Sequence, residues 1–408
     1  MATLDYTQVD TTNQPDPSLA DEAVELAATL LAQANAEMRP AERAQMAKIG
    51  GMMDDPDGKA LTMQMSDQAF RSHQSARVAD QIHHLLAQYG VPNYFAAWER
   101  AALWLGDKVA QIAPQFVVPF IVAKLRQETN NVLLPGEPEP FRRYLEKRRA
   151  DGTRLNINHL GEAVLGEAEA GRRFDAYLDL LARPDVEYIS VKISSVFSQI
   201  NLVAYEQTVE AIKERLRRLY HQAMMYTYER PDGTRVPKFV NLDMEEYRDL
   251  HPTVAAFQEV LSEDEFHKLR AGIVLQAYLP DSFRVQQALT AWAQARVEDG
   301  GAPIKLRIVK GANLAMEQVE ASIHGWEQAP YTSKAGVDAN YKRMVTYGST
   351  PERAKAVNLG IASHNLFDVS YAMLLRERNG IVPQHPILFG LDLFALTPIF
   401  DVDWKEQL

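Results

Sequence analysis

The sequence predicts an α/β protein in which a (βα)8, TIM-like barrel follows an all-helical N-terminal region. After residue 150, short runs rich in β-branched residues alternate with long amphipathic segments. The starts of consecutive runs leave about 30 residues or more for each unit, which is enough for one strand and one helix. No run is followed by a Gly-x-Gly-x-x-Gly or Walker A sequence. Repeated strand–helix units without these nucleotide-binding loops favour a barrel.

The first 150 residues contain helical patterns and no convincing strand. Residues 1–18 are typical of a polar tail. Apolar residues three and four positions apart predict helices over 19–47, 67–89, 94–105 and 116–128. Residues 54–58, Asp-Asp-Pro-Asp-Gly, predict a turn between the first two helices. We therefore expect residues 1–150 to form a helical region that precedes the barrel.

Six barrel strands are expected, all parallel to one another. They are predicted near residues 154–160, 188–194, 239–244, 272–278, 304–310 and 358–364. Amphipathic patterns over 163–182 and 203–226 predict two of the helices between them. The predicted barrel domain is 151–408, with an atypical sequence after about residue 380.

Composition excludes several classes of protein. The chain has 54 acidic and 43 basic residues, and a net charge of −11 argues against a nucleic-acid or anionic-membrane binder. Without cysteine, the chain has no disulfide, no Cys-ligated zinc, no iron–sulfur cluster and no thiol catalysis, and it fits a reducing compartment. We expect no metal site. Prolines 114 and 119 interrupt the most apolar stretch, residues 112–125, which is too short to span a bilayer.

Polar residues gather at the carboxyl ends of the predicted strands. They are Glu162, Lys192, Ser194, Ser195, Asp243, Glu245, Glu246, Gln276, Tyr278, Arg307, Lys310, Ser363, His364 and Asn365. Any one of them could simply cap a helix or meet water. Polar residues at six strand ends together, several of them Lys, Arg, Asp or Gln within apolar runs, are harder to explain in that way, because a buried charge requires a partner or a function. In a parallel barrel these ends converge on the mouth where barrel enzymes keep their active sites.

The types of residue suggest what this mouth binds. Lys192 and Arg307 are cations suited to a substrate carboxylate or an electron-rich ring. Asp243 could orient a cation or a ring nitrogen. Gln276 and the backbone around Gly311 could contact a flat heterocycle or a phosphate.

Six segments in one order resemble the FAD-dependent proline dehydrogenases, above all the proline dehydrogenase part of bacterial bifunctional proline-catabolic enzymes. The segments are LGEAVLGEAEA, SVKISSVFSQI, VNLDMEEY, IVLQAYLPDS, LRIVKGANLAMEQ and LGIASHNLFDVSYAM. The resemblance implies a distorted (βα)8 barrel and flavin-dependent oxidation of L-proline to Δ1-pyrroline-5-carboxylate. It also implies a quinone as electron acceptor and a cytoplasmic protein, or one bound peripherally to the inner face of the membrane.

The resemblance also implies roles for individual residues. Asp243 and Arg307 correspond to the catalytic pair, Lys192 to the lysine that contacts the proline carboxylate, and Glu162 to a glutamate of the substrate site. The residues that correspond to FAD contacts are Met244, Gln276, Arg307, Lys310, Gly311, Ala312, Ser363 and His364.

The sequence departs from the family pattern at two places. Asn313 stands where many relatives carry an aromatic residue. Nothing in residues 381–408 resembles the last family helix with its Arg-Arg clamp for the substrate carboxylate. From this we expect retained affinity for FAD and reduced turnover of proline. Two other interpretations stay open: a cofactor-free barrel lyase with Lys192 as a Schiff-base nucleophile, and a non-catalytic remnant of the family.

Overall fold

The computed structural model describes residues 17–65, 72, 74–129, 138–150, 154–158, 164 and 166–381. These residues divide into two compact units. The barrel unit contains residues 17–30 and the described residues from 142 onward, and the helical unit contains the described residues of 31–141. In the described part of the chain, no helix is both long enough and apolar enough to cross a membrane.

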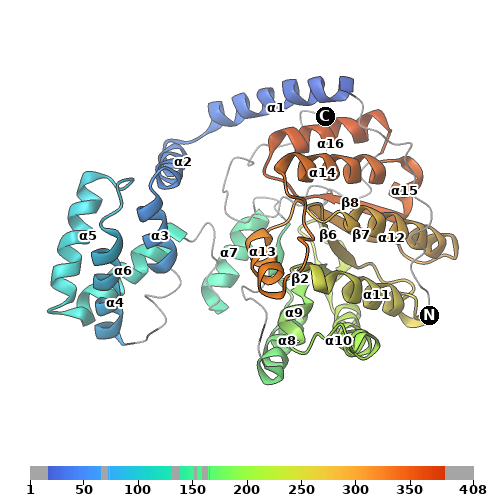
Figure 1. Ribbon diagram of the computed structural model, residues 1–408, viewed down its shortest axis with the longest axis horizontal. Helices are drawn as coiled ribbons and strands as arrows, with labels where there is room; N and C mark the ends of the chain where they lie inside the picture. Colours follow the sequence, from blue (N-terminus) through green and yellow to red (C-terminus); the bar gives the residue numbers. More distant parts are fainter. Residues whose placement is uncertain are drawn as a thin grey trace. The chain divides into compact units, whose positions relative to one another are not determined.

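The barrel unit is built on one parallel sheet (Figure 1). Its strands are β1 (Asn156–Asn158), β2 (Tyr188–Lys192), β5 (Phe239–Asp243), β6 (Gly272–Gln276), β7 (Ile304–Val309) and β8 (Val357–Ile361). They lie in the order β1-β2-β5-β6-β7-β8, and all five pairings are parallel. This confirms the predicted α/β fold class, in which a helical N-terminal region precedes six parallel strands in the sequence.

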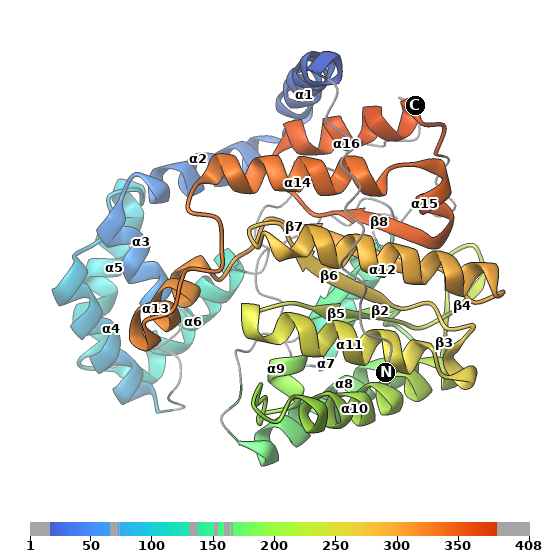
Figure 2. The ribbon, with the colours of Figure 1, turned by 45° about the vertical axis from the view of Figure 1, so that its right-hand side comes forward.

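Helices follow the strands, and most of them cover the outer side of the sheet (Figure 2). They are α8 (Glu167–Ala182), α9 (Ile193–Val196), α10 (Tyr205–Met225), α11 (Leu250–Leu261), α12 (Asp281–Glu298), α13 (Leu314–His324), α14 (Lys334–Gly348), α15 (Pro351–Ala356) and α16 (Leu366–Arg378). Short 3-10 helices span Tyr247–Asp249 and Asp264–Phe266. The helix α8 packs against β2, α10 against β5, α12 against β6 and α14 against β7. The strands β2, β5, β6, β7 and β8 are largely buried, as parallel strands covered by helices are, whereas in β1 only Ile157 is buried.

A small antiparallel hairpin, absent from the sequence prediction, lies between α10 and β5. It consists of β3 (Thr227–Glu229) and β4 (Arg235–Pro237), with Tyr228 opposite Val236. Gly233 in the turn has φ +80°. The Pro-Asp-Gly sequence at 231–233 explains this turn, because proline fixes the entering backbone and glycine adopts positive φ without strain.

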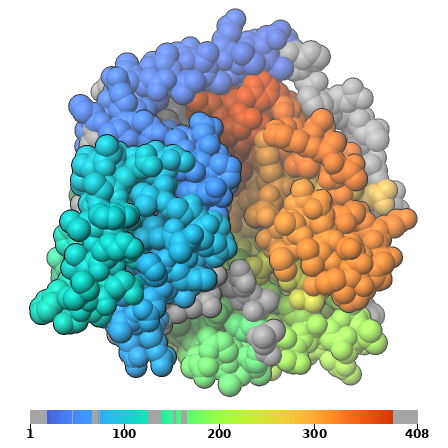
Figure 3. Space-filling view, turned by 60° about the vertical axis from the view of Figure 1, so that its left-hand side comes forward, coloured from blue at the N-terminus to red at the C-terminus, as the bar shows by residue number. Residues whose placement is uncertain are grey.

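The helical unit holds α2 (Pro40–Met53), α3 (Pro56–Gln64), α4 (Ser75–Tyr89), α5 (Ala97–Ala110) and α6 (Pro114–Thr129). Leu61, Ile82, Leu85 and Val118 belong to its buried core. The surface of this unit is blue to teal in Figure 3. The remaining helices, α1 (Pro17–Glu37) and α7 (Pro138–Ala150), each contain residues of both units.

Two predictions for the N-terminal region were wrong in detail. The helix predicted over 19–47 is interrupted before Pro40, which begins α2, because proline restricts the preceding residue to extended backbone, and Arg39 has ψ 154°. The turn predicted at 54–58 is mostly the start of α3. Asp55 caps this helix by accepting from the Gly58 amide at 3.1 Å, and Pro56 occupies the first helical position.

Candidate functional site

The predicted catalytic pair is formed by the ends of two strands. Asp243 is the last residue of β5, and Arg307 lies on β7. Nη2 of Arg307 donates to Oδ1 of Asp243, and the two side chains are only 6% and 11% exposed. Because both charges are largely removed from water, each depends on the other for compensation. The structure thus brings together an anionic and a cationic side chain that the sequence placed on separate strands.

A second ion pair lies beside the first. Lys192 ends β2 and stands opposite Asp243 in the register of the sheet. Its Nζ donates to Oε1 of Glu245 at 2.8 Å, and Oγ of Ser194 donates to Oε2 of Glu245 at 2.5 Å. The lysine side chain is 25% exposed, so its charge is still accessible to a ligand. A Schiff-base lysine is usually activated by apolar surroundings or a neighbouring cation, whereas Lys192 is paired with the Glu245 carboxylate.

Glu245 connects more of the predicted site than sequence reasoning assigned to it. Its backbone carbonyl accepts from Nε2 of Gln276 at 3.3 Å and from Nδ2 of Asn313 at 2.9 Å. Together with the contacts of its carboxylate, this single residue joins the ends of β2, β5, β6 and β7. Its position directly after the strand end was visible in the sequence, but nothing there distinguished it from Glu246.

The loop after β7 is held by a cluster of carboxylates. Nζ of Lys310 lies 2.7 Å from Oδ1 of Asp338 and 2.7 Å from Oδ2 of Asp368. Oγ of Ser363 donates to the same Asp368 oxygen at 2.8 Å. These contacts raise the pKa of Lys310 against the opposing effect of burial. The predicted residues Lys310 and Ser363, from different strand ends, therefore share one carboxylate.

The remaining predicted residues occupy different surroundings. Met244 is buried directly after β5, whereas Ala312 and His364 are exposed. Glu162 lies outside the described residues, as does most of 381–408. The helix α13, which follows the loop after β7, lies on the surface of the barrel unit (orange in Figure 3). It is tied to the loop after β5 by Glu317, whose Oε1 accepts from the Tyr247 amide at 2.7 Å.

Gly311 allows this loop to approach the neighbouring strand end closely. It has φ +121°, and a Cβ added there would lie 2.5 Å from the ring of Tyr278. We expect Gly311→Ala to destabilise the barrel unit by roughly 2–4 kcal/mol, from backbone strain together with the steric clash. The control is Gly233→Ala, where φ is +80° but nothing lies within 4 Å. Urea denaturation of both variants checks this prediction, and equal losses at the two positions would contradict it.

Asp249 provides a pH-dependent element next to the site. Burial, and then the charge of Glu246, raise its pKa from 3.8 to about 7. The unfolded chain therefore releases this proton at lower pH than the folded chain. The contribution of Asp249 to the free energy of unfolding should therefore fall by up to roughly 4 kcal/mol as pH rises from about 4 to about 7.

Asp249→Asn should remove this pH dependence and stabilise the protein at pH 7 to 8. The measurement is urea denaturation from about pH 4 to pH 8. The control is Asp299→Asn, because the Asp299 side chain is 84% exposed. Unfolding curves of Asp249→Asn that follow the unchanged protein at every pH would show that Asp249 is not the group responsible.

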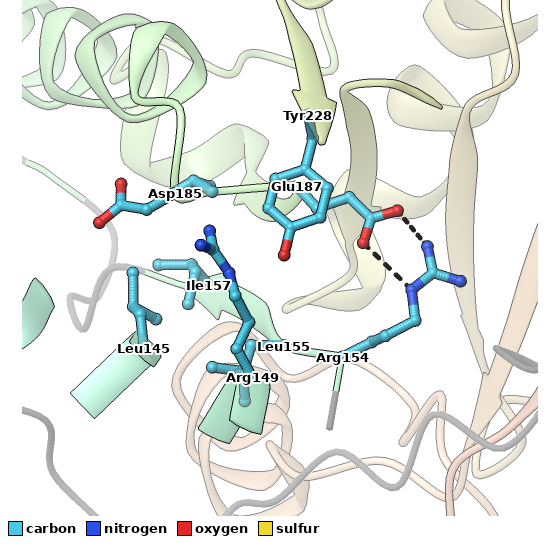
Figure 4. A pocket seen from close by; sticks show the side chains of 9 residues that line it. Leu145, Arg149, Arg154, Leu155, Ile157, Asp185, Glu187 and Tyr228 are labelled. Atoms are coloured by element: carbon cyan, nitrogen blue, oxygen red, sulfur yellow. Dashed lines mark hydrogen bonds and ion pairs between the residues drawn. The ribbon is translucent and has the colours of Figure 1, made fainter. Parts of the chain in front are cut away.

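A cavity at the opposite, amino-terminal end of the strands is less suited to a substrate (Figure 4). Its volume of about 20 Å³ has room for one or two water molecules. Figure 4 shows the Arg154 guanidinium turned toward Glu187, to which its Nε donates at 3.1 Å. The Arg149 guanidinium lies over the Tyr228 ring at 4.9 Å. The charged groups of this cavity contact other residues that line it, so the carboxyl ends of the strands remain the candidate active site.

Parallel strands with charged side chains gathered at their carboxyl ends are the arrangement that barrel enzymes have. The sequence model of the family described as proline dehydrogenase matches residues 141–392, which is more than half of the chain. The chain therefore belongs to the proline dehydrogenase family. No curated protein matches it in sequence.

Solved structures of proline utilization A (PutA) resemble the chain. The protein from Corynebacterium freiburgense is 48% identical over 64% of this chain and 26% of its own, with a TM-score of 0.58. The protein from Bdellovibrio bacteriovorus, inactivated by N-propargylglycine, is 27% identical, and the match covers 89% of this chain and 36% of its own, with a TM-score of 0.70. A third protein, from Bradyrhizobium japonicum, is 19% identical over 89% of this chain and 38% of its own, with a TM-score of 0.59. At this identity the similarity shows the fold alone. The chain thus spans between 26% and 38% of the length of these relatives.

Proposed function

We propose that this chain binds FAD and oxidises L-proline to Δ1-pyrroline-5-carboxylate. The observation that carries the proposal is the pair of neighbouring ion pairs, Asp243 with Arg307 and Lys192 with Glu245, within the part of the chain that matches the family. Fixed charges of both signs at the carboxyl ends of neighbouring strands suit a zwitterionic amino acid, whose carboxylate and amine need partners of opposite charge.

The residues at the strand ends fit a flavin. Gln276 is only 3% exposed, and its buried Oε1 accepts no hydrogen bond from the residues that the structure describes. An unused acceptor in a buried position is suited to a ring N–H of a flat heterocycle. Gly311 is exposed after β7, and because it has no side chain its backbone is accessible to a ligand. We assign the contacts with the cofactor to Met244, Gln276, Arg307, Lys310, Gly311, Ala312, Ser363 and His364.

Proline loses a hydride from the ring carbon next to nitrogen and a proton from that nitrogen, which leaves a carbon–nitrogen double bond. Bound FAD supplies the acceptor for the hydride. The chain's own contribution is to position the substrate and provide charge complementarity. Lys192 binds the carboxylate of proline, with Glu162 as a further substrate contact. Asp243 and Arg307 fix the charges next to the reacting carbon.

A quinone is the proposed acceptor of the electrons from the reduced cofactor, and we infer a cytoplasmic protein, or one bound peripherally to the inner face of the membrane. Both inferences rest on the family resemblance alone. Re-oxidation of the cofactor requires no further cofactor, because a quinone takes up the two electrons of each turnover.

FAD titration and dye reduction with proline test the proposed function. We expect the purified chain to bind FAD and, once loaded, to reduce a dye with L-proline and not with D-proline. Borohydride trapping at Lys192 with a carbonyl substrate, without bound flavin, would instead support a lyase. A chain that binds flavin weakly or not at all and turns over neither substrate would support the non-catalytic interpretation.

A further inference from the structure

Two asparagine side chains reach the carboxylate of Asp243 from inside the barrel. Nδ2 of Asn241 donates to Oδ1 at 2.9 Å, and Nδ2 of Asn158 donates to Oδ2 at 3.3 Å. Arg307 also donates to Oδ1. With donors on both oxygens, the plane of this carboxylate is fixed, and the position of the Arg307 guanidinium is fixed with it. A carboxylate only accepts hydrogen bonds, so each amide must present its NH2 group here.

The alternation of the strand explains why Asn241 is there. It lies two residues before Asp243 on β5, so both side chains point to the same side of the sheet. Ser190 on β2 stands opposite Asn241 in the register, and its Oγ accepts from Nδ2 of Asn241 at 3.4 Å and from Nδ2 of Asn156 at 2.8 Å. A continuous polar network therefore crosses the barrel from β1 to β7.

Stability alone does not account for this asparagine. Asn241 is fully buried, and within the described part of the chain its Oδ1 has no hydrogen-bond partner. Burying an unpaired amide oxygen costs free energy that an apolar side chain of similar size would avoid. A Cβ at Gly272 would lie 2.5 Å from this oxygen, so the neighbouring strand carries a glycine where the amide needs space. The barrel thus accommodates a costly group whose amide donates to Asp243 at 2.9 Å.

We propose that Asn241, assisted by Asn158, is a positioning residue that orients Asp243 and, through it, Arg307 for the oxidation of the substrate. This inference rests on the proposed function. It predicts that the two asparagines act on the rate of the chemical step more than on the binding of substrate or cofactor.

Asn241→Leu removes the donor while keeping the size of the side chain. We expect kcat with proline to fall about 10- to 100-fold, because small displacements of positioned groups have effects of this size. The KM for proline and the dissociation constant for FAD should change less than about threefold. Asn158→Leu should change kcat in the same direction by a smaller factor, and it carries the test if Asn241→Leu does not fold. Asn358→Leu is the matched control: Asn358 lies on β8, and its Nδ2 donates to the Ile304 carbonyl at 3.4 Å.

Asn241→Asp adds a readout that a merely structural role would not change. A protonated carboxyl at 241 can donate to Asp243, whereas an ionised one cannot donate and repels it. The deficit in kcat relative to the unchanged protein should therefore deepen as pH rises from about 5 to about 8. The melting temperature should fall relative to the unchanged protein over the same range. Asn358→Asp, beside Lys305 in the register, should show neither trend.

The melting comparison separates this inference from the proposed function. If the unchanged protein does not oxidise proline, the proposed function fails, and the pH-dependent melting of Asn241→Asp against Asn358→Asp still decides whether Asn241 is coupled to Asp243. If the unchanged protein is active, kcat within threefold of its value in Asn241→Leu overturns the inference. Equal kcat losses in Asn241→Leu and Asn358→Leu also overturn it.

Discussion

Arg307→Met is expected to lower kcat/KM for proline by two to four powers of ten and to destabilise the barrel unit by about 3–5 kcal/mol. Removing one partner of a buried ion pair leaves the other charge without compensation in a medium of low polarity. Asp243 would keep its contacts with Asn241 and Asn158, but neutral donors replace a cation poorly. Steady-state dye reduction and urea denaturation measure the two effects.

The double variant Arg307→Met/Asp243→Asn shows whether the effect comes from the pair. It should be less destabilised than the sum of the single variants by about 1–3 kcal/mol, because no charge is then left unpaired. Arg235→Met is the control, since Arg235 pairs with Glu229 at the surface, where the two side chains are 74% and 59% exposed. We expect a change below about 1 kcal/mol there. Additive effects of the two site substitutions would contradict the proposed coupling.

Lys192→Met is expected to raise the KM for proline by roughly 100-fold while leaving the dissociation constant for FAD within about threefold. A charge-assisted contact between an ammonium and a carboxylate contributes roughly 1.5–3 kcal/mol, which corresponds to one or two powers of ten in binding. Without Lys192, the Glu245 carboxylate also faces the substrate carboxylate without a cation between them. Both effects weaken capture of the substrate.

Lys213→Met is the matched control for this substitution. Lys213 is 14% exposed and pairs with Glu210 and Glu259, away from the strand ends. Its removal should lower the free energy of unfolding and leave the KM unchanged. A KM for Lys192→Met within threefold of the unchanged protein would show that another cation binds the carboxylate.

The strands could be predicted because their sequences carry the relevant physics. Most of the six runs are rich in apolar, β-branched residues, and helical patterns lie between them, which specifies parallel strands connected by helices. The ends of the strands were less certain. In the predicted run at 154–160, the strand is Asn156–Asn158; residues 154 and 155 precede it without strand structure, and 159 and 160 lie outside the described residues. The β3–β4 hairpin was missed because its three-residue strands are too short to produce a period in the sequence.

The site was harder to predict than the strands. Sequence position alone placed Lys192, Asp243, Gln276 and Arg307 at one edge, and the structure joins these residues through Asp243 and Glu245. Which carboxylate each cation selects depends on geometry between strands, which no local pattern encodes. Asn241 was overlooked for the same reason, since an asparagine in an apolar run does not reveal which residue its amide contacts.

The measurement that tests the central proposal most directly is anaerobic reduction of the FAD-loaded chain by L-proline, followed through the blue absorbance band of the flavin. The proposal predicts that this band bleaches with one proline consumed per flavin, that Δ1-pyrroline-5-carboxylate forms in equal amount, and that a quinone restores the band. Bound flavin that keeps its absorbance at saturating proline would contradict it.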